Sequence, residues 1–224
     1  MSTKINSVRR LREEQLKTSK REFKARGSLL VRCPECLLGE NDCVCGLIEP
    51  HQSEIAVCML MYHAEYYKPS NTGQLICDAV ADNFAFRWYR TEFEPSLKNL
   101  LEDPKWFPII VFPHDSVELD RKIHNIPTTD NRNGKRPLLI FLDGTWRQAK
   151  KMFIKSPYLD KFPVLEVSGI AKGEYKLRES QHDHHLSTVE VATAIFSQEG
   201  EQQMSDDLLK LFTTFRNRYQ LLKR

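Results

Sequence analysis

Short runs of consecutive apolar residues recur along the chain, and each stops abruptly at polar or turn-forming residues. The clearest is Leu138 to Leu142, which shows no polar alternation and is followed at once by Asp143-Gly144-Thr145-Trp146. A short run of this kind is typical of a strand buried on both faces of a sheet. The pattern also predicts strands at residues 54–62, 109–112 and 162–167, and a short strand with its turn at 84–93.

Segments with helical periodicity separate these strands. The stretch from Trp146 to Ile154 places its larger apolar side chains on one stripe, and either Asp143 or Thr145 can cap it. Further helices are predicted at residues 72–82, 96–105, 188–198 and 205–222. Strands that alternate with helices favour a parallel α/β sheet, in which ligands bind where strands end. Three predicted strand ends lead into candidate ligand loops, at residues 113–116, 143–146 and 168–178.

Composition limits the class of protein. A chain of 224 residues with 41% hydrophobic content is suited to one domain with small appendages. No apolar run approaches the length of a membrane span, and the first residues lack the apolar core of a signal peptide. We therefore expect a cytoplasmic protein with no membrane association and no stable protein partner.

Charge is concentrated at the start of the chain. Residues 1–27 hold nine basic and three acidic residues, a net charge of +6 against +3 for the whole chain. The segment predicts either a solvated helix or tail, or a basic arm that lies along a phosphate backbone. We divide the chain into a basic helical arm at 1–29, a cysteine element at 30–50 and a catalytic domain at 51–224.

Four cysteines form a compact C-x2-C-x6-C-x-C cluster: Cys33, Cys36, Cys43 and Cys45. Four thiolates at this spacing can complete a tetrahedral zinc site, and free thiols are the alternative. A site closed by four cysteines is structural, because no position stays open for water. Cys58 and Cys77 lie outside this pattern.

Other polar clusters give weaker signals. Ser70-Asn71-Thr72-Gly73 precedes a predicted helix, where backbone N–H groups favour an anionic group. For His63 and Glu65 a hydrogen bond or a substrate contact is favoured over metal binding, and metal is also disfavoured for the histidines of residues 182–185. Neither a G-x-G-x-x-G dinucleotide motif nor a P-loop is present.

Four groups of residues carry a resemblance to a known family. They are the cysteine cluster, His63-x-Glu65 with Ser70-Asn71-Thr72-Gly73, Asp143-x-Thr145-Trp146-x-x-Ala149-x-x-Met152, and Tyr175-x-Leu177-Arg178 with Leu186-Ser187-Thr188-x-Glu190. In this order, over about residues 30–200, they resemble the DTW-domain family of tRNA-uridine aminocarboxypropyltransferases. Lys68 and Ser70 depart from the Arg and Thr expected in relatives.

The resemblance implies a SPOUT-like knotted parallel sheet flanked by helices, with S-adenosylmethionine as donor and structural zinc in the cysteine element. The acceptor would be N3 of a uridine in the tRNA variable loop. The products would be 3-(3-amino-3-carboxypropyl)uridine and methylthioadenosine. The rival hypotheses are a SPOUT-type RNA methyltransferase and a non-catalytic zinc-bearing RNA-binding protein.

Site residues follow from the matching motifs and their neighbours. We expect the catalytic residues to be Asp143, Thr145 and Trp146. Donor-binding candidates are Pro113, His114, Leu142, Gly144, Tyr175, Arg178, Thr188 and Glu190. Acceptor-binding candidates are His63, Glu65, Asn71, Thr72, Gly73, Arg147 and Lys150, with Lys151, Lys155 and loop 132–136 as further phosphate contacts. Arg178 is the candidate for the donor carboxylate, and Asp143 is either the base for uridine N3 or a helix cap or contact to the donor amine.

Overall fold

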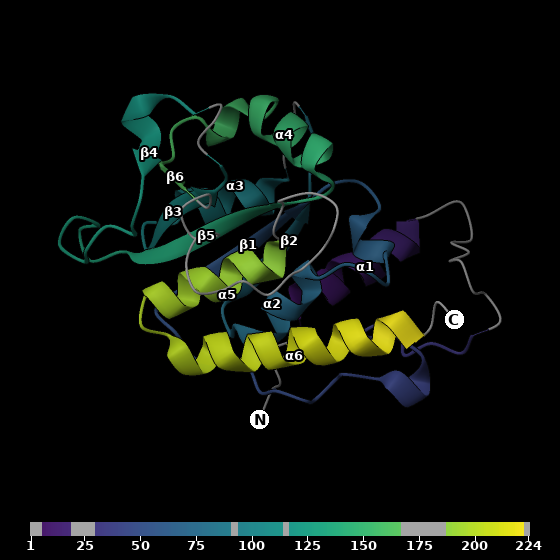
Figure 1. Ribbon diagram of the computed structural model, residues 1–224. Helices are drawn as coiled ribbons and strands as arrows, with labels where there is room; N and C mark the ends of the chain where they lie inside the picture. The colour runs from purple at the N-terminus through teal and green to yellow at the C-terminus, as the bar shows by residue number, and fades with distance from the viewer. Residues whose placement is uncertain (1–5, 19–29, 91–93, 114–116, 167–186, 222–224) are drawn as a thin grey trace.

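The fold was analysed in a computed structural model, which describes residues 6–18, 30–90, 94–113, 117–166 and 187–221 (Figure 1). One fully parallel sheet has the strand order β2-β1-β5-β3-β6-β4. Its strands are β1 Ala56–Met61, β2 Asn83–Arg87, β3 Trp106–Val111, β4 Lys122–Ile123, β5 Arg136–Asp143 and β6 Val164–Leu165. The α-helices are α1 Ser7–Thr18, α2 Gly73–Ala79, α3 Pro95–Glu102, α4 Trp146–Ile154, α5 Thr188–Gln198 and α6 Gln202–Leu221. Short 3-10 helices are η1 Glu40–Asp42, η2 Glu65–Tyr67, η4 Leu119–Arg121 and η5 Pro157–Leu159.

Helices cover both faces of this sheet, which explains the unbroken apolar runs. Every residue of β1 is buried, and so is every residue of β5 after Arg136. Alternate residues of these strands face two separate apolar clusters. One cluster contains side chains of α1, α2, α5 and α6, and the other contains side chains of α3 and α4. In Figure 1, α5 and α6 lie below the sheet and α4 lies above it.

Parallel register brings several strand ends to one edge. Met61 at the end of β1 is level with Asp143 at the end of β5 and with Arg87 at the end of β2. In the sheet, β2 lies on the outer side of β1 and β3 on the outer side of β5. The order in which successive strands are placed therefore reverses at the central pair, β1 and β5. The carboxyl edge at such a reversal is where open α/β sheets bind ligands.

The sequence patterns predicted the elements better than their limits. The α4 bounds agree with the prediction, whereas α2 ends at Ala79 because Val80 is already extended. The strand β4 was missed, since two residues are too short for any periodicity. The parallel α/β sheet is confirmed. A knot lies outside what the structure establishes, because residues 167–186, which join β6 to α5, are not among the described residues.

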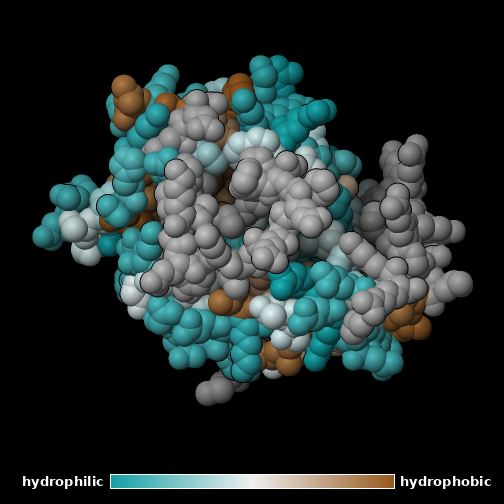
Figure 2. All heavy atoms as spheres, viewed as in Figure 1, coloured by the Kyte–Doolittle hydropathy of each residue, from teal (hydrophilic) through white to brown (hydrophobic). Residues whose placement is uncertain are grey.

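Where Figure 2 shows described residues, the surface is mostly hydrophilic, with separate hydrophobic spots. Among the described residues, the exposed large apolar ones are Leu16, Leu30, Val31, Leu47, Leu119, Trp146 and Ile154. Within the described ranges, no helix combines the length and apolar character needed to cross a membrane.

Helix α1 belongs to the packed fold. Its Val8 and Leu11 are buried in the same apolar cluster as α2 and α6. Arg9 pairs with Asp78 at 2.7 Å, and Arg12 donates to the carbonyl oxygens of Pro34 and Glu35. These two guanidinium groups, which we had counted in the basic arm, are therefore engaged within the chain.

Shortening Leu11 tests this docking. Leu11→Ala is expected to lower the free energy of unfolding by about 2–5 kcal/mol, because it leaves a cavity beside α2. Leu16→Ala, on the exposed side of the same helix, is the matched control and should change it by less than about 0.5 kcal/mol. Urea denaturation measures both, and equal effects would contradict the docking of α1.

Candidate active site and metal centre

Asp143 lies at the carboxyl end of the central strand β5 with its side chain buried. The side-chain amide of Asn71 donates to Asp143 Oδ2 at 2.5 Å, and the Thr188 hydroxyl donates to Asp143 Oδ1 at 3.2 Å. Both carboxylate oxygens thus have a donor. Asn71 precedes α2 and Thr188 opens α5, so the two helices supply the partners of one strand-end carboxylate.

The first turn of α2 determines how the Asn71 amide faces Asp143. The Oδ1 atom of Asn71 accepts from the backbone N–H of Gln74 at 3.1 Å, which satisfies a donor that the helix itself leaves unpaired. The Nδ2 atom of Asn71 is therefore the one directed at Asp143. An amide in this orientation can only donate to the carboxylate, and it stabilises the ionised form.

Gly73 allows α2 to approach this carboxylate closely. A Cβ atom at Gly73 would lie 2.7 Å from Met59 Cε and 3.2 Å from Asp143 Cγ. A side chain at this position would therefore require the Met59 methyl group and the Asp143 carboxylate to shift. Gly73 was predicted as an acceptor contact, and the structure assigns it this packing role.

Burial, helped by the negative charge of Glu65, raises the pKa of Asp143 to about 6, although the hydrogen bonds from Asn71 and Thr188 and the positive charge of Lys68 act in the opposite direction. Glu65 is itself buried and pairs with Lys68 at 2.5 Å. A carboxylate with a pKa near the working pH can take up a proton and release it again, which suits a general base.

An aromatic stack flanks the same edge of the sheet. The Trp146 ring lies 5.5 Å from Phe112, at an interplanar angle of 7°, and Phe112 stacks in turn on Phe153 at 4.5 Å. Phe112 follows β3 and Trp146 begins α4, so packing between two elements presents the indole, which remains 42% exposed. Trp146 can therefore offer an aromatic surface to a planar ligand group.

The residues on either side of Asp143 and Trp146 shape the turn between them. Thr145 is the N-cap of α4 and forms a capping box with Gln148. A Cβ at Gly144 would lie 3.1 Å from Gln148 Cβ and 3.2 Å from Tyr62 Cβ, which explains the glycine. Thr145 was predicted to be catalytic, and what the structure shows for it is this cap.

Several predicted residues lie near Asp143, and others are separate or outside the described part of the chain. Glu65, Asn71, Gly73 and Thr188 gather around Asp143, and Glu190 closes the capping box of α5 with Ser187.

The remaining predicted residues have other positions or lie outside the described part of the chain. Thr72 is the N-cap of α2, His63 is exposed, and Arg147 and Lys150 are exposed on α4. Leu142 points into the apolar cluster with α4, and Pro113 is half-buried after β3. His114, Tyr175 and Arg178 lie outside the described residues.

Sequence reasoning missed three residues of this edge: Tyr62, Gln74 and Phe112. Tyr62 and Phe112 directly follow β1 and β3, and Gln74 directly follows the Ser70–Gly73 motif. Their position next to strand ends and motifs was a usable signal. We had placed Tyr62 and Phe112 in apolar strands and Gln74 inside a helix, so none of the three was named as a site residue.

The four predicted cysteines converge. Their sulfur atoms all lie within 4.8 Å of one another, and three pairs are separated by 3.5, 3.8 and 3.9 Å. Four thiolates at about 2.3 Å from a tetrahedral zinc ion lie about 3.8 Å apart, so the geometry fits this metal. The cluster can hold a metal ion, and Cys58 and Cys77 are buried elsewhere in the core.

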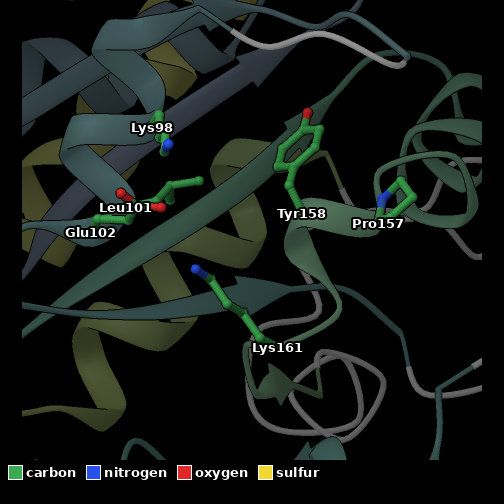
Figure 3. Close-up of a pocket in the computed structure, with 6 residues that line it drawn as sticks. All are labelled: Lys98, Leu101, Glu102, Pro157, Tyr158 and Lys161. Atoms are coloured by element: carbon green, nitrogen blue, oxygen red, sulfur yellow. The ribbon is translucent and has the colours of Figure 1, made fainter.

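A small cavity of about 120 Å³ lies elsewhere, between α3 and η5 (Figure 3). It is lined by Lys98, Leu101, Glu102, Pro157, Tyr158 and Lys161. None of these residues belongs to the predicted site, and Figure 3 shows side chains of α3 facing those around η5. We therefore place the candidate active site at Asp143.

Fold and site together define an α/β protein whose candidate ligand site lies at the carboxyl ends of its central parallel strands, with a four-cysteine cluster that could hold a metal ion. The DTW domain matches residues 30–220, and the chain belongs to the DTW-domain family. The match extends the region of resemblance through α6.

One curated relative is tRNA-uridine aminocarboxypropyltransferase 2 of Drosophila melanogaster, 30% identical over 98 residues. The matched region covers 43% of this chain and 35% of that relative, so it spans about a third of the relative's length. No solved structure matches the chain.

The metal centre predicts a zinc content of about one ion per chain, since four ligands complete one site. Cys36→Ser removes a ligand and should abolish stoichiometric zinc and lower the unfolding temperature. Cys58→Ala, in β1, is the control and should keep the metal. Elemental analysis after gel filtration measures the ratio, and wild-type protein free of zinc after expression with ample metal would contradict the assignment.

The raised pKa of Asp143 makes a second prediction, about stability. As pH rises from about 4 to 6, the unfolded chain releases this proton before the folded protein does, so stability falls across that window. Above it, the ionised buried carboxylate costs about 3 kcal/mol. Asp143→Asn cannot ionise, its amide oxygen can accept from Asn71, and its amide nitrogen can donate to Thr188.

The variant should therefore be more stable than the wild type at pH 8 by up to about 3 kcal/mol, and equally stable near pH 4. Urea denaturation at both pH values measures the difference. Asp120→Asn, at an exposed position in η4, is the control and should show no such pH-dependent gain. A variant less stable than the wild type at pH 8 would overturn this account of Asp143.

Proposed function

We propose that the chain transfers the 3-amino-3-carboxypropyl group of S-adenosylmethionine to N3 of a uridine in the tRNA variable loop. The single observation that carries the proposal is Asp143, a buried carboxylate with a pKa raised to about 6, at the strand edge that bears the family's motif. The name of the Drosophila relative supports the reaction class. A SPOUT-like knotted topology and a structural zinc ion are parts of the same proposal.

The reaction forms a bond between uridine N3 and the γ-carbon of the donor and breaks the bond from that carbon to sulfur. The sulfonium supplies the leaving group and departs as methylthioadenosine with the bonding electron pair. The N3 proton passes to Asp143, whose ionised form is favoured by the amide of Asn71 and the hydroxyl of Thr188. Arg178 is proposed to bind the donor carboxylate.

Cations on α4 are proposed to contact the RNA. Arg147 and Lys150 are exposed on this helix, and Lys155 is exposed at its C-cap. Lys151 Nζ lies 5.7 Å from the centroid of the Tyr62 ring and 3.4 Å from its hydroxyl. The Tyr62 backbone N–H donates to the Asp143 carbonyl at 2.9 Å, so this positive group lies beside the catalytic edge. A cationic flank next to the base-accepting site fits an acceptor with a phosphate backbone.

Product analysis tests the proposed reaction. Purified protein, given S-adenosylmethionine and unmodified tRNA, should release methylthioadenosine and yield a uridine heavier by one aminocarboxypropyl group. Asp143→Asn should lose turnover by a factor of at least about 100, the usual contribution of a general base. Asp120→Asn should retain it. Liquid chromatography with mass spectrometry measures both products.

The alternatives give different outcomes. S-adenosylhomocysteine with a methyl gain would identify a methyltransferase, and tRNA binding without donor binding in calorimetry would identify a non-catalytic RNA-binding protein. Calorimetry also separates the two roles of Asp143. An Asp143→Asn variant that binds the donor normally but does not turn over supports the base, whereas lost donor binding supports a contact to the donor amine.

A further inference from the structure

We propose that Gln74 is a positioning residue that links the four-cysteine loop to Asp143 through Asn71. The inference rests on the proposed function for its activity readout, and on the geometry alone for its stability readout. Gln74 lies in the first turn of α2 and is 1% exposed, and its side chain hydrogen-bonds Asn71 and the cysteine loop and not Asp143 itself.

Two hydrogen bonds of the Gln74 side chain join separate segments. Its Nε2 atom donates to the carbonyl oxygen of Asn71 at 3.2 Å and to the carbonyl oxygen of Cys36 at 3.4 Å. A primary amide has two N–H groups, so it can serve both carbonyls at once. Cys36 is a predicted metal ligand, and Asn71 donates to Asp143, so the metal loop and the catalytic carboxylate are linked through these two residues.

The backbone of Gln74 holds the other end of Asn71. Its N–H donates to Asn71 Oδ1, and its carbonyl accepts from Asn6 Nδ2 at 2.7 Å. Gln74 therefore donates hydrogen bonds to both the main-chain oxygen and the side-chain oxygen of Asn71. This leaves the Asn71 Nδ2 atom at 2.5 Å from Asp143. Loss of the Gln74 side-chain amide removes one of these two hydrogen bonds and weakens the hydrogen bond from Asn71 to Asp143.

The chemistry explains why this position needs glutamine. Methionine has a similar length without donors, and would leave two buried carbonyls unpaired. Glutamate would place a carboxylate against two carbonyl oxygens. Metal binding at Cys36 would hold the main chain that presents the carbonyl to Gln74, so the state of the metal loop reaches Asp143 through this amide.

The other groups around Asp143 do not depend on Gln74. Glu65 and Lys68 face it from η2, Cys77 from α2, and Thr188 from α5. The Asn71 hydrogen bond lowers the pKa of Asp143. Weakening that bond should therefore raise this pKa further, and the direction of the shift reports on the link through Asn71.

Gln74→Met is the test variant, and Gln220→Met, on the exposed side of α6, is the matched control. We expect the acid limb of the pH–rate profile to move upward by about one pH unit in Gln74→Met, because the hydrogen bond from Asn71 that favours the ionised carboxylate is weakened. Turnover at pH 6 should fall about fivefold, because a one-unit rise lowers the ionised fraction of Asp143 at that pH by this factor, and it should recover toward pH 8.5. Zinc content should stay at the wild-type ratio, and the control should match the wild type throughout.

A stability cycle gives a readout that needs no activity. The unfolding free energies of wild type, Asp143→Asn, Gln74→Met and the double variant, measured from pH 4 to 8, report the pKa of Asp143 in each background. The stability gain from Asp143→Asn at pH 8 should be larger in the Gln74→Met background. Removing zinc from the wild type should shift the profile in the same direction, and removing it from Gln74→Met should add no further shift.

The results separate this inference from the proposed function. An unchanged pH profile and an unchanged stability cycle in folded, zinc-loaded Gln74→Met would overturn the role of Gln74. A shifted stability cycle in a protein without transferase activity would overturn the proposed function and leave the link from Gln74 to Asp143 intact.

Discussion

Burial of the Asp143 carboxylate at the end of β5 is the constraint on which the candidate site depends. A carboxylate removed from water needs donors for both oxygens, and here they come from the starts of α2 and α5. Gly73 leaves room for this carboxylate, because a Cβ atom there would lie 3.2 Å from Asp143 Cγ. The position of Asp143, its ionisation and the packing of α2 and α5 against β5 are therefore tied to one buried carboxylate. Its cost to stability at neutral pH is the expected signature of a functional group.

The four-cysteine loop shows how a segment without a large core of its own is held. Carbonyl oxygens of this loop accept from Arg12 of α1, Gln74 of α2 and Arg218 of α6. Its buried residues also join the apolar cluster that contains α2 and α6. A metal ion would thus cross-link a loop that already accepts hydrogen bonds from three helices. This arrangement makes the cysteine cluster part of the scaffold of the candidate active site.

The edge itself combines groups of different chemical character. Asp143 is buried and titrates near pH 6, the Trp146 indole is partly exposed, and Lys151 lies over an aromatic ring. A proton acceptor, a flat apolar surface and a cation within one strand edge fit a substrate that is both a nucleobase and a polyanion. The family membership and the tRNA-modifying relative agree with that chemistry.

Local patterns in the sequence determined which segments form elements. The apolar runs of β1, β3 and β5 need no partner to be recognised, because burial on both faces removes alternation. The limits of α4 and the capping residues of α4 and α5 could also be read from local chemistry. The cysteine spacing likewise predicted a cluster that the structure brings together.

Only the tertiary structure decided how these segments act on one another. That Asn71 and Thr188 meet Asp143 across 72 and 45 residues follows from strand order and register, which local sequence does not encode. The same holds for α1, whose charges suggested an exposed arm although Val8 and Leu11 bury it. The roles of Gly73 and Gln74 depend on close contacts between distant segments. Periodicity reports the environment of one element, whereas such contacts depend on the packing of several.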